Sequence, residues 1–298
     1  MVERLRAAVE STRTEAVGAF GGFAGLFALD RERLLAATTD GVGNKLGLCR
    51  RAGRLEVAGG DVAAHCINDV ATTGAEPLFL LDYVAASELD LDEVAALVTG
   101  LAAVCRQAGC AILGGETAEL PRVYREGELD FVATCVGLVR REDLLDGSRC
   151  RPGDAVLGLP SSGLHTNGYT LVRALLGEDE PVDADLLLAP HRLYLRDVRR
   201  LREDCDVRTL AHVTGGGLPG NLPRALPPGL GARLDPAAWD RPPVYAWLEE
   251  RGVPEEEQRR VFNLGVGYCA IVPPEHAARA AFPVIGRLEE GLQGVAWA

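Results

Sequence analysis

The sequence predicts an α/β (α+β) protein built from two domains, and three observations support this. The chain has 298 residues, 47% of them hydrophobic, enough for one large core or two of ordinary size. Strand-like apolar stretches alternate with amphipathic helical stretches in both halves. Turn-forming residues gather in LLDGSRCRPGDAVLGLP, so we place the boundary there, with domains at 1–147 and 148–298.

The beginning of the chain predicts a helix, a loop and a strand before the first long helix. Residues 2–10 are amphipathic and predict a short helix, whereas the glycine-rich segment 18–27 has neither period and predicts a mobile loop. Residues 33–40 (RLLAATTD) predict a strand. The next stretch, VAGGDVAAHCINDVATTGAEP, begins as a turn and continues as a helix, with Asp61 at its N-cap or in its first turn.

Strands and a helix alternate through the rest of the first half. Residues 78–86 (LFLLDYVAA) are apolar apart from one Asp and predict a buried strand. Residues 89–109 have helical spacing and end at a glycine, a common helix terminator. CAILGGET (110–117) predicts a strand that runs into a glycine turn, and 130–143 predict a strand of alternating character.

The second half repeats the order strand, glycine turn, helix. A strand begins at Ala155 and is followed by the polar loop SSGLHTNGY (161–169) and a helix. LAHVT (210–214) predicts a strand that leads into GGGLPG (215–220), and 262–273 predict a late strand. This order predicts a C-terminal α/β domain.

Charge and composition argue against several classes of protein. The net charge of −12 disfavours a surface for nucleic acid or anionic membrane, because no basic stripe offsets it. No apolar stretch is long enough for a membrane span, and the N-terminus lacks the apolar core of a secretion signal. The eight cysteines form no C-x-x-C pair, which predicts reduced, mostly buried thiols. We therefore expect a cytoplasmic protein.

Lys45 is the only lysine among 31 cationic side chains, and it lies in TTDGVGNKLGL. The excess of Arg is typical of mutational pressure on the coding sequence, so a lysine that persists is informative. Lys is a compact point charge, whereas Arg is a wide planar fork. A tight turn at Gly41 and Gly43 that places one charge on a phosphate suits Lys. The alternative is chance survival at the surface.

Five carboxylates lie beside glycines or at the ends of predicted elements in the first half. They are Asp40, Asp61, Asp69, Asp82 and Glu116. One such residue is usually a turn former or an N-cap, but five of them, several in apolar sequence, are harder to explain in that way. Buried carboxylates need partners, and Mg²⁺ prefers oxygen ligands. The pattern favours a magnesium–nucleotide site near Lys45.

Two polar loops of the second half are candidates for substrate contact. GGGLPG matches G-x-G-x-x-G but has no acidic residue at the usual later spacing, so it is a weak dinucleotide signal. Glycines that leave N–H groups free at a helix start can still bind an anion, and His212 could contact the same anion. The alternative for His212 is a core histidine. SSGLHTNGY contains no G-x-S-x-G and predicts a polar contact loop.

Six stretches, in order and spacing, resemble the aminoimidazole ribonucleotide synthetase (phosphoribosylformylglycinamidine cyclo-ligase) family. They are TTDGVGNK, DVAAHCINDVATTGAEPLFLLDY, GGETAELP, GLPSSGLHTNGYTLVR, HVTGGGLPGNLPRALP and FNLGVGY, between about Arg13 and Val272. The stretch from Asp69 to Pro77 is shared with a wider ATP-binding superfamily. This chain departs from the family in Asn44, where Thr is typical, and in His65, which we interpret as a helix-surface or core residue.

The resemblance implies a two-domain ATP-binding synthetase fold. In this fold the N-terminal domain forms a dimeric β-barrel interface from strands of both chains, so a homodimer is expected. It also implies a ligase of purine biosynthesis. ATP phosphorylates the formyl oxygen of formylglycinamidine ribonucleotide, the amidine nitrogen attacks the activated carbon, and phosphate leaves. Positioning and charge neutralisation should supply most of the rate.

The matched motifs imply ATP and Mg²⁺ as cofactors, a ribonucleotide substrate and the following site residues. ATP-binding residues are Asp40, Gly41, Gly43, Lys45, Asp61, Asp69, Gly114, Gly115, Glu116 and Thr117, among which Asp40, Asp61, Asp69 and Glu116 hold the metal. Substrate-binding residues are Ser161, Ser162, His165, Asn167, His212, Gly215, Gly216, Gly217 and Asn263. Catalytic residues are Lys45, His165 and Asp82.

Two other functions stay open. One is a different reaction of the same superfamily, such as that of a thiamine monophosphate kinase or a selenophosphate synthetase. The second is an inactive nucleotide-binding scaffold. The paired SSGLHTNGY and HVTGGG stretches disfavour the kinase, the absence of a Cys before Cys49 disfavours the selenophosphate synthetase, and Lys45 with the acidic set disfavours the scaffold.

Overall fold

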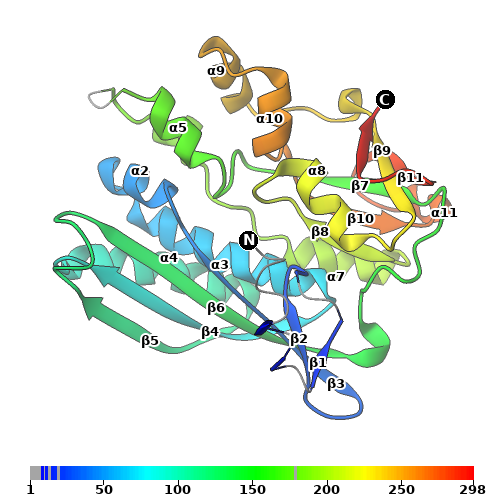
Figure 1. Ribbon diagram of the computed structural model, residues 1–298, viewed down its shortest axis with the longest axis horizontal. Coiled ribbons are helices and arrows are strands. Elements are labelled where there is room, and N and C mark those ends of the chain that lie inside the picture. The colour runs from blue at the N-terminus through cyan, green and yellow to red at the C-terminus, as the bar shows by residue number, and fades with distance from the viewer. Residues whose placement is uncertain (1–7, 10, 13–14, 19–20, 178–179) are drawn as a thin grey trace.

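Two six-stranded sheets, each with its own helices, make up the computed structural model (Figure 1). It describes residues 8–9, 11–12, 15–18, 21–177 and 180–298. Strand order in the first sheet is β1-β2-β3-β6-β4-β5, and in the second it is β12-β9-β11-β7-β10-β8. Within each sheet one pair is parallel, β4 with β5 and β12 with β9, and the others are antiparallel. The fold is therefore a mixed α/β architecture of two units.

The first sheet belongs wholly to the first half of the chain. Its strands are β1 (Ala16–Val17), β2 (Gly25–Ala28), β3 (Arg33–Gly41), β4 (Glu76–Ala86), β5 (Ala111–Glu119) and β6 (Leu129–Arg140). The helices of this half are α2 (Lys45–Arg51), α3 (Leu55–Thr72), α4 (Leu91–Ala108) and the short η1 (Arg141–Asp143). Helices α3 and α4 lie along one face of the sheet (Figure 1).

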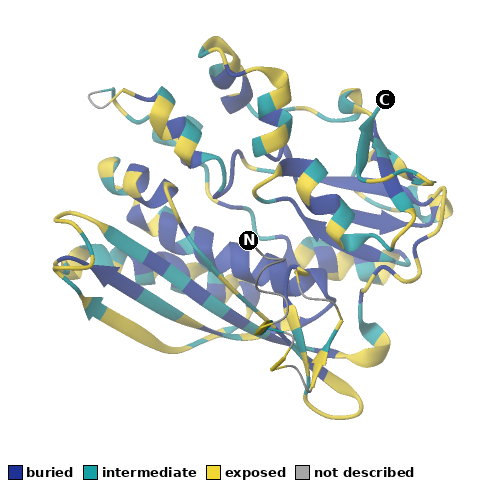
Figure 2. Cartoon of the chain, in the orientation of Figure 1, coloured by how far each residue is buried: buried dark blue, intermediate teal, exposed yellow. Residues whose placement is uncertain are grey.

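No helix covers the opposite face of the first sheet in the described part of the chain (Figure 1). Large apolar side chains remain exposed on its strands, including Phe27 on β2, Leu81 on β4 and Leu113 on β5. Most of β5 is exposed along its length (Figure 2). An apolar face of this kind commonly marks an association surface.

The second sheet comes from residues after 154 and is covered on both faces. Its strands are β7 (Ala155–Pro160), β8 (Thr209–His212), β9 (Leu230–Leu234), β10 (Val266–Val272), β11 (Val284–Glu290) and β12 (Val295–Trp297). Helix α7 (Leu195–Asp204) packs on one face, and α8 (Gly217–Asn221) with η2 (Leu222–Ala225) packs on the other. The remaining helices are α5 (Tyr169–Leu175), α6 (Ala184–Leu187), η3 (Pro236–Ala238), α9 (Val244–Glu250), α10 (Glu255–Val261) and α11 (Pro274–Ala277).

One hydrophobic core joins the two halves. The cluster that contains Ile67 of α3 and Phe131 of β6 also contains Tyr169, Leu248 and Phe262 from the second half. All eight cysteines are free and seven of them are buried, as expected for reduced thiols. No helix among the described residues combines the length and apolar character that a membrane crossing needs. The proposed division at residue 147 stays a prediction.

Several predicted elements are confirmed and others are wrong. Strand β3 and helix α4 match their predictions, and Gly109 ends α4 in the left-handed conformation. Asp61 is not at a helix start, because α3 begins at Leu55. The GGET stretch is extended within β5 and forms no turn, and β4 is only half buried. The predicted loop 18–27 contains strand β2, and the predicted helix 2–10 lies mostly outside the described residues.

Candidate functional site

A continuous chain of polar side chains, all buried except Asp40, crosses the junction between the two halves. Asp40, His65 and Asp69 come from β3 and α3, and the other members come from segments after residue 160. In order of contact the chain is Asp40, His65, Thr166, His191, His212 and Asp69. We call these six residues the junction chain. It brings together two of the predicted metal ligands and one predicted substrate residue.

The Asp40 end of the junction chain is a contact between a carboxylate and an imidazole. His65 Nε2 lies 3.0 Å from Asp40 Oδ2, and His65 Nδ1 lies 2.8 Å from Thr166 Oγ1. Burial alone lowers the pKa of His65, but the hydrogen bond that its ring donates to Asp40 and the charges of Asp69 and Asp40 outweigh burial and raise that pKa. Burial likewise opposes ionisation of Asp40, yet His65 and the Gly41 N–H together lower the pKa of Asp40. Each group therefore shifts the pKa of the other toward its charged form.

The Asp69 end consists of two imidazoles and a carboxylate. His191 Nε2 lies 3.0 Å from His212 Nε2, and His212 Nδ1 lies 2.8 Å from Asp69 Oδ1. Burial lowers the pKa of His191 well below its usual value and also lowers the pKa of His212, although Asp69 opposes the second shift. Both rings are therefore neutral at pH 7.

Lys45 is enclosed by protein. It is the first residue of α2, directly after the turn that contains Gly43, whose φ is +61°. Its Nζ lies 2.5 Å from Asp61 Oδ2 and donates to the Ala189 carbonyl at 2.8 Å, and neither charged side chain is exposed. The other Asp61 oxygen accepts from the His191 N–H at 2.7 Å. Burial raises the pKa of Asp61, and the charge of Lys45 opposes that shift.

In a single copy of the chain, Glu116 lies far from the other predicted metal ligands. It is exposed on β5, three strands from Asp40 on β3, which corresponds to about 14 Å. Its neighbour on β4 is Tyr83. Side chains alternate along a strand, and Asp82 and Val84 on either side of Tyr83 face the helices, so Tyr83 and Glu116 lie on the opposite face of the sheet. The Asp61 oxygens contact Lys45 and the His191 N–H, so they are already occupied by protein groups.

Asp82 and its glycine neighbours lie on β4 and β5. Asp82 is half-buried, and burial raises its pKa. Gly115 is its register partner, and a Cβ there would lie 2.4 Å from the Asp82 carbonyl oxygen, so only glycine fits. Gly114 and Thr117 are exposed on the same strand, and Thr117 donates its N–H to Glu116 at 2.9 Å.

The polar loop 161–169 lies next to the glycine-rich turn 215–217, and both stretches are predicted to contact the substrate. Ser161 donates to Asn263 Oδ1 at 3.0 Å, Asn263 donates to the Gly163 carbonyl at 2.9 Å, and Ser162 donates to the Pro190 carbonyl. These three predicted substrate residues fix the loop. Asn167 Oδ1 would lie 3.1 Å from a Cβ placed on Gly215, so the two stretches are neighbours.

His165 and Asn167 carry buried nitrogens without partners. Both ring nitrogens of His165 and Asn167 Nδ2 are buried and have no hydrogen bond to any described residue. His165 also has a φ of +61°, which is rare outside glycine and is found at functional sites. Burial keeps the pKa of His165 well below its ordinary value. Unsatisfied buried nitrogens of this kind are typical of a ligand site.

The glycines after His212 form a tight turn with left-handed backbone. Gly216 and Gly217 have φ of +93° and +60°, and the Gly217 N–H donates to Thr214 O at 3.1 Å. The Gly217 N–H is therefore not available to an anion, and the N–H groups of Gly215 and Gly216 are the remaining predicted donors. Both of these residues are exposed.

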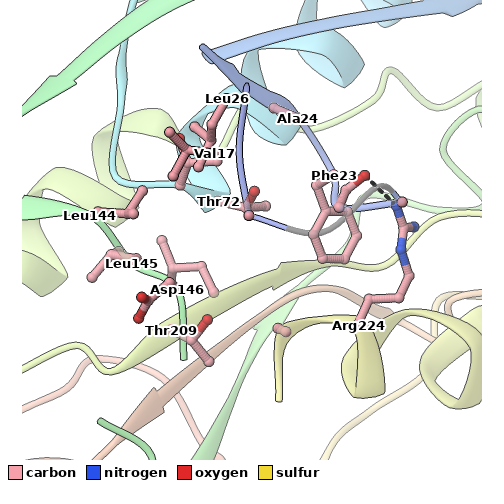
Figure 3. Close-up of a pocket in the computed structure, with 16 residues that line it drawn as sticks. Val17, Phe23, Ala24, Leu26, Thr72, Leu144, Leu145, Asp146, Thr209 and Arg224 are labelled. Atoms are coloured by element: carbon pink, nitrogen blue, oxygen red, sulfur yellow. Dashed lines mark hydrogen bonds between the residues drawn. The ribbon is translucent and has the colours of Figure 1, made fainter. Parts of the chain in front are cut away.

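Two cavities border predicted site residues, and a third lies elsewhere between the two halves of the chain. A groove of about 890 Å³ includes Gly216, Arg259 and Arg260, and a cavity of about 350 Å³ includes Gly43 with Arg50, Tyr124 and Arg173. The third, also about 350 Å³, lies between the β1–β2 segment, the end of α3 and η2. Figure 3 shows it, with Arg224 against the Phe23 ring and donating to the Gly22 carbonyl. These volumes are in the range of small-molecule sites.

Sequence reasoning missed part of this site. His191 and Thr166 were not predicted as functional, and His65 was predicted only as a surface or core residue. The chain has only five histidines, and four of them are buried where the two halves meet. Their positions, 65, 165, 191 and 212, share no spacing that would have indicated contact.

Two family models and several relatives match the chain. Residues 21–139 match the model described as AIR synthase related protein, N-terminal domain, and residues 151–292 match its C-terminal domain counterpart. A phosphoribosylformylglycinamidine cyclo-ligase of Anaeromyxobacter dehalogenans (strain 2CP-1) is 47% identical over 309 residues, covering 95% of this chain and 90% of the relative. One from Synechococcus sp. (strain CC9605) is 47% identical over 290 residues, covering 91% and 84%.

Solved structures share the fold of this chain, and the family models and relatives identify its family. The structure described as AaThiL complexed with AMPPCP and TMP has a TM-score of 0.70 at 17% identity and covers 100% of this chain and 94% of that chain. Hydrogenase maturation protein HypE in complex with ATP has a TM-score of 0.63 at 24% identity, with 89% and 79% covered. These two establish the fold alone. Because both family models match and the identity extends over most of the chain, the protein belongs to the AIR synthase, or phosphoribosylformylglycinamidine cyclo-ligase, family of ligases.

Proposed function

We propose that this chain closes the imidazole ring of aminoimidazole ribonucleotide in de novo purine biosynthesis. The substrate is formylglycinamidine ribonucleotide. Its formyl oxygen attacks the γ-phosphoryl group of ATP and ADP leaves; the amidine nitrogen then attacks the activated carbon and phosphate leaves. The observation that carries this proposal is the 47% identity, over 95% of the chain, with a cyclo-ligase.

Asp40 and Asp69 are the residues that would hold Mg²⁺ at the nucleotide end. They belong to one junction chain, and the Asp40 carboxylate is 39% exposed, so an ion could reach it. Their hard oxygen donors suit Mg²⁺, which would neutralise phosphate charge. Asp61 and Lys45 would support this end from their buried pair. Glu116 could contact the same ion only if a second copy of the chain brought it there, because its own β5 is too far away.

ATP would lie along the turn that contains Gly41 and Gly43. Arg50 and Arg173 border the cavity at Gly43 and would add positive charge near its phosphates. The two fold relatives described above were solved with AMPPCP and with ATP, which supports a nucleotide in this fold. Gly114, Gly115 and Thr117 on β5 would contribute only with Glu116. Lys45 would act on a phosphate only after a change in its contact with Asp61.

The ribonucleotide would occupy the other end, between Asn167 and the glycine turn. Asn167 Nδ2 is a buried donor that needs an acceptor, and the N–H groups of Gly215 and Gly216 suit the ribose phosphate. Arg259 and Arg260 in the adjoining groove would favour an anion. His165 is neutral at pH 7 and would accept or donate a proton as the ring closes, with His212 nearby. Asp82 is the further catalytic candidate, because its raised pKa suits proton transfer.

The protein would work as a cytoplasmic homodimer without nucleic-acid or membrane partners. The uncovered face of the first sheet offers Leu81 and Leu113 for the pairing, and strands of two copies would form the β-barrel implied by the family. The net charge of −12 disfavours polyanionic partners.

An ADP-release assay tests this function. The chain is incubated with Mg-ATP and formylglycinamidine ribonucleotide, thiamine monophosphate or no substrate. We expect ADP and phosphate only with the ribonucleotide, together with the imidazole product. Equal ADP release with thiamine monophosphate would point to a kinase, and no release with either compound would point to a scaffold.

A further inference from the structure

Three imidazoles of the buried cluster are arranged as ligands for a second kind of metal ion. We infer that His165, His191 and His212 bind a divalent transition metal ion, with Zn²⁺ as the natural case. One ligand nitrogen from each ring lies within 4.8 Å of the other two, and all three rings are buried. In a tetrahedral zinc site with Zn–N bonds of about 2.0–2.1 Å, ligand nitrogens lie about 3.3 Å apart. The His191 and His212 Nε2 atoms, at 3.0 Å, are already close to that spacing.

His165 has two ring nitrogens that are unpartnered in the described part of the chain, and it lies beside the Nε2–Nε2 contact of His191 and His212. His165 is fully buried, and neither of its ring nitrogens has a partner among the described residues, so each leaves a hydrogen-bonding group unsatisfied. Two Nε2 atoms that face each other, as in His191 and His212, can share only one proton. A metal ion would satisfy all three rings, because each can offer a lone pair to it.

The surroundings of the rings resemble the supporting shell of known metal sites. His212 donates its Nδ1 hydrogen to Asp69 at 2.8 Å, which leaves Nε2 as the lone-pair nitrogen. His191 Nδ1 lies 3.3 Å from Thr166 Oγ1, which leaves its Nε2 for the same ion.

One rearrangement is required. The rings of His165 and His191 are stacked, with centroids 4.0 Å apart and planes inclined by 18°. A metal ion lies in the plane of each ligating ring, so His165 must turn about its side-chain bonds when the ion binds. Its two nitrogens make no hydrogen bond to the described residues that this turn would break.

This site is distinct from the proposed magnesium site. Imidazole is a softer ligand than carboxylate and favours zinc, copper or nickel over magnesium. The other possible set, His65, Asp69 and His212, is weaker because both of its rings already have contacts through both nitrogens. The favoured set includes His165, whose two nitrogens have no partner among the described residues. The two proposals share His165, His212 and Asp69, so metal binding must be measured directly and not through activity.

Competition with a chromophoric chelator tests the zinc site. The full chain is freed of metal and titrated with Zn²⁺ without nucleotide. We expect one tight equivalent, strong loss of affinity in His165→Ala and His191→Ala, and a loss of about 10–100-fold in Asp69→Asn. His276→Ala is the matched control, because His276 is the one histidine that is not among the four buried at the junction. This variant should bind Zn²⁺ as the wild type does. Unchanged affinity in both cluster variants would overturn the site.

Cobalt spectroscopy on the wild-type chain tests the same site without relying on variants, which could fail to fold. The eight free cysteines are the competing soft ligands, and all but Cys110 are buried. With Co²⁺ bound to three imidazoles, the visible bands should be those of nitrogen ligands, without a thiolate charge-transfer band. A thiolate band, or anomalous diffraction from zinc elsewhere than between the three rings, would reject the assignment.

Discussion

At the scale of single residues, the lone lysine has a structural explanation. Lys45 and Asp61 form a fully buried ion pair between α2 and α3, and two further contacts, to Ala189 and His191, tie that pair to the second half. An ammonium group fits a closed site that a wide guanidinium would have to enlarge. This explanation is independent of the predicted contact between Lys45 and a phosphate, which stays a prediction.

Removing the lysine should destabilise the protein strongly. Lys45→Met leaves Asp61 charged and buried without its partner, which typically costs about 3–5 kcal/mol. Urea unfolding should report that loss in the free energy of unfolding. The double variant Lys45→Met/Asp61→Leu removes both charges and should recover much of it. If the double variant is as unstable as the sum of its single changes, the pair is not coupled.

Asp69 should couple Mg-nucleotide binding to stability. Saturating Mg-ATP analogue should raise the Tm of the wild type by several degrees, because ligand at 100 times its Kd adds about 2.7 kcal/mol. Asp69→Asn should show little of this shift, since a neutral amide is a poor ligand for Mg²⁺. Asp204→Asn, at an exposed pair with Arg200, is the control and should respond as the wild type does. An equal shift in Asp69→Asn removes Asp69 from the site.

A substitution at Gly216 should distinguish the ribonucleotide end of the site from the ATP end. A Cβ there would meet only Gly220 Cα at 3.4 Å, but the φ of +93° strains any other residue, so Gly216→Ala should distort the turn. We expect a higher KM for the ribonucleotide with KM for ATP near normal in steady-state kinetics. Equal weakening of both substrates would assign the turn to the nucleotide or to folding.

At the scale of elements, two glycines allow α3 and α4 to touch. A Cβ on Gly59 would lie 1.9 Å from the Leu97 carbonyl oxygen, and a Cβ on Gly100 would lie 1.9 Å from that of Glu56. The helix backbones are therefore in direct contact at these points. This contact also explains why the GG pair at 59–60 is helical where its sequence indicates a turn.

Gly59→Ala should push the two helices apart. Overpacking of this kind costs about 1–3 kcal/mol or more, because the obstacle is backbone and cannot rotate away. Gly47→Ala is a matched control in α2, where the nearest atom to a new Cβ is 3.7 Å away on the flexible Arg173. It should be neutral or slightly stabilising, since Ala is the better helix former. Thermal unfolding of the two variants gives the comparison.

Elements could be predicted where their signals are local. The end of α4 is an example, because Gly109 was predicted to end the helix and does so in the left-handed conformation. The GGET stretch and Asp61 were misplaced, because their conformations depend on pairing with β4 and on packing against α4. The contacts among His65, His191 and His212 depend on how the two halves meet, which no local pattern encodes.

At the scale of the whole molecule, the uncovered sheet face should control association. Leu81 alternates with the buried Leu80 on β4 and is 41% exposed on that face. Leu81→Asp should convert the expected dimer to a monomer, because a charge cannot be buried there without a partner. Leu91→Asp, at a position 83% exposed at the start of α4, should leave the mass unchanged. Light scattering after gel filtration measures both, and a monomeric wild type would contradict the dimer.

The shared hydrophobic core has a consequence for synthesis on the ribosome. The first sheet is complete once Arg140 has been made, but Phe262 and Leu264, which close the same core, follow about 120 residues later. At ~5–20 residues per second this delay lasts roughly 6–25 s. During the first part of that interval, until His191 has been made, Lys45 and Asp61 lack their contacts with the second half, and throughout it the apolar surface of α3 lacks part of its cover. The nascent first half is thus the stage at which a chaperone has most to protect.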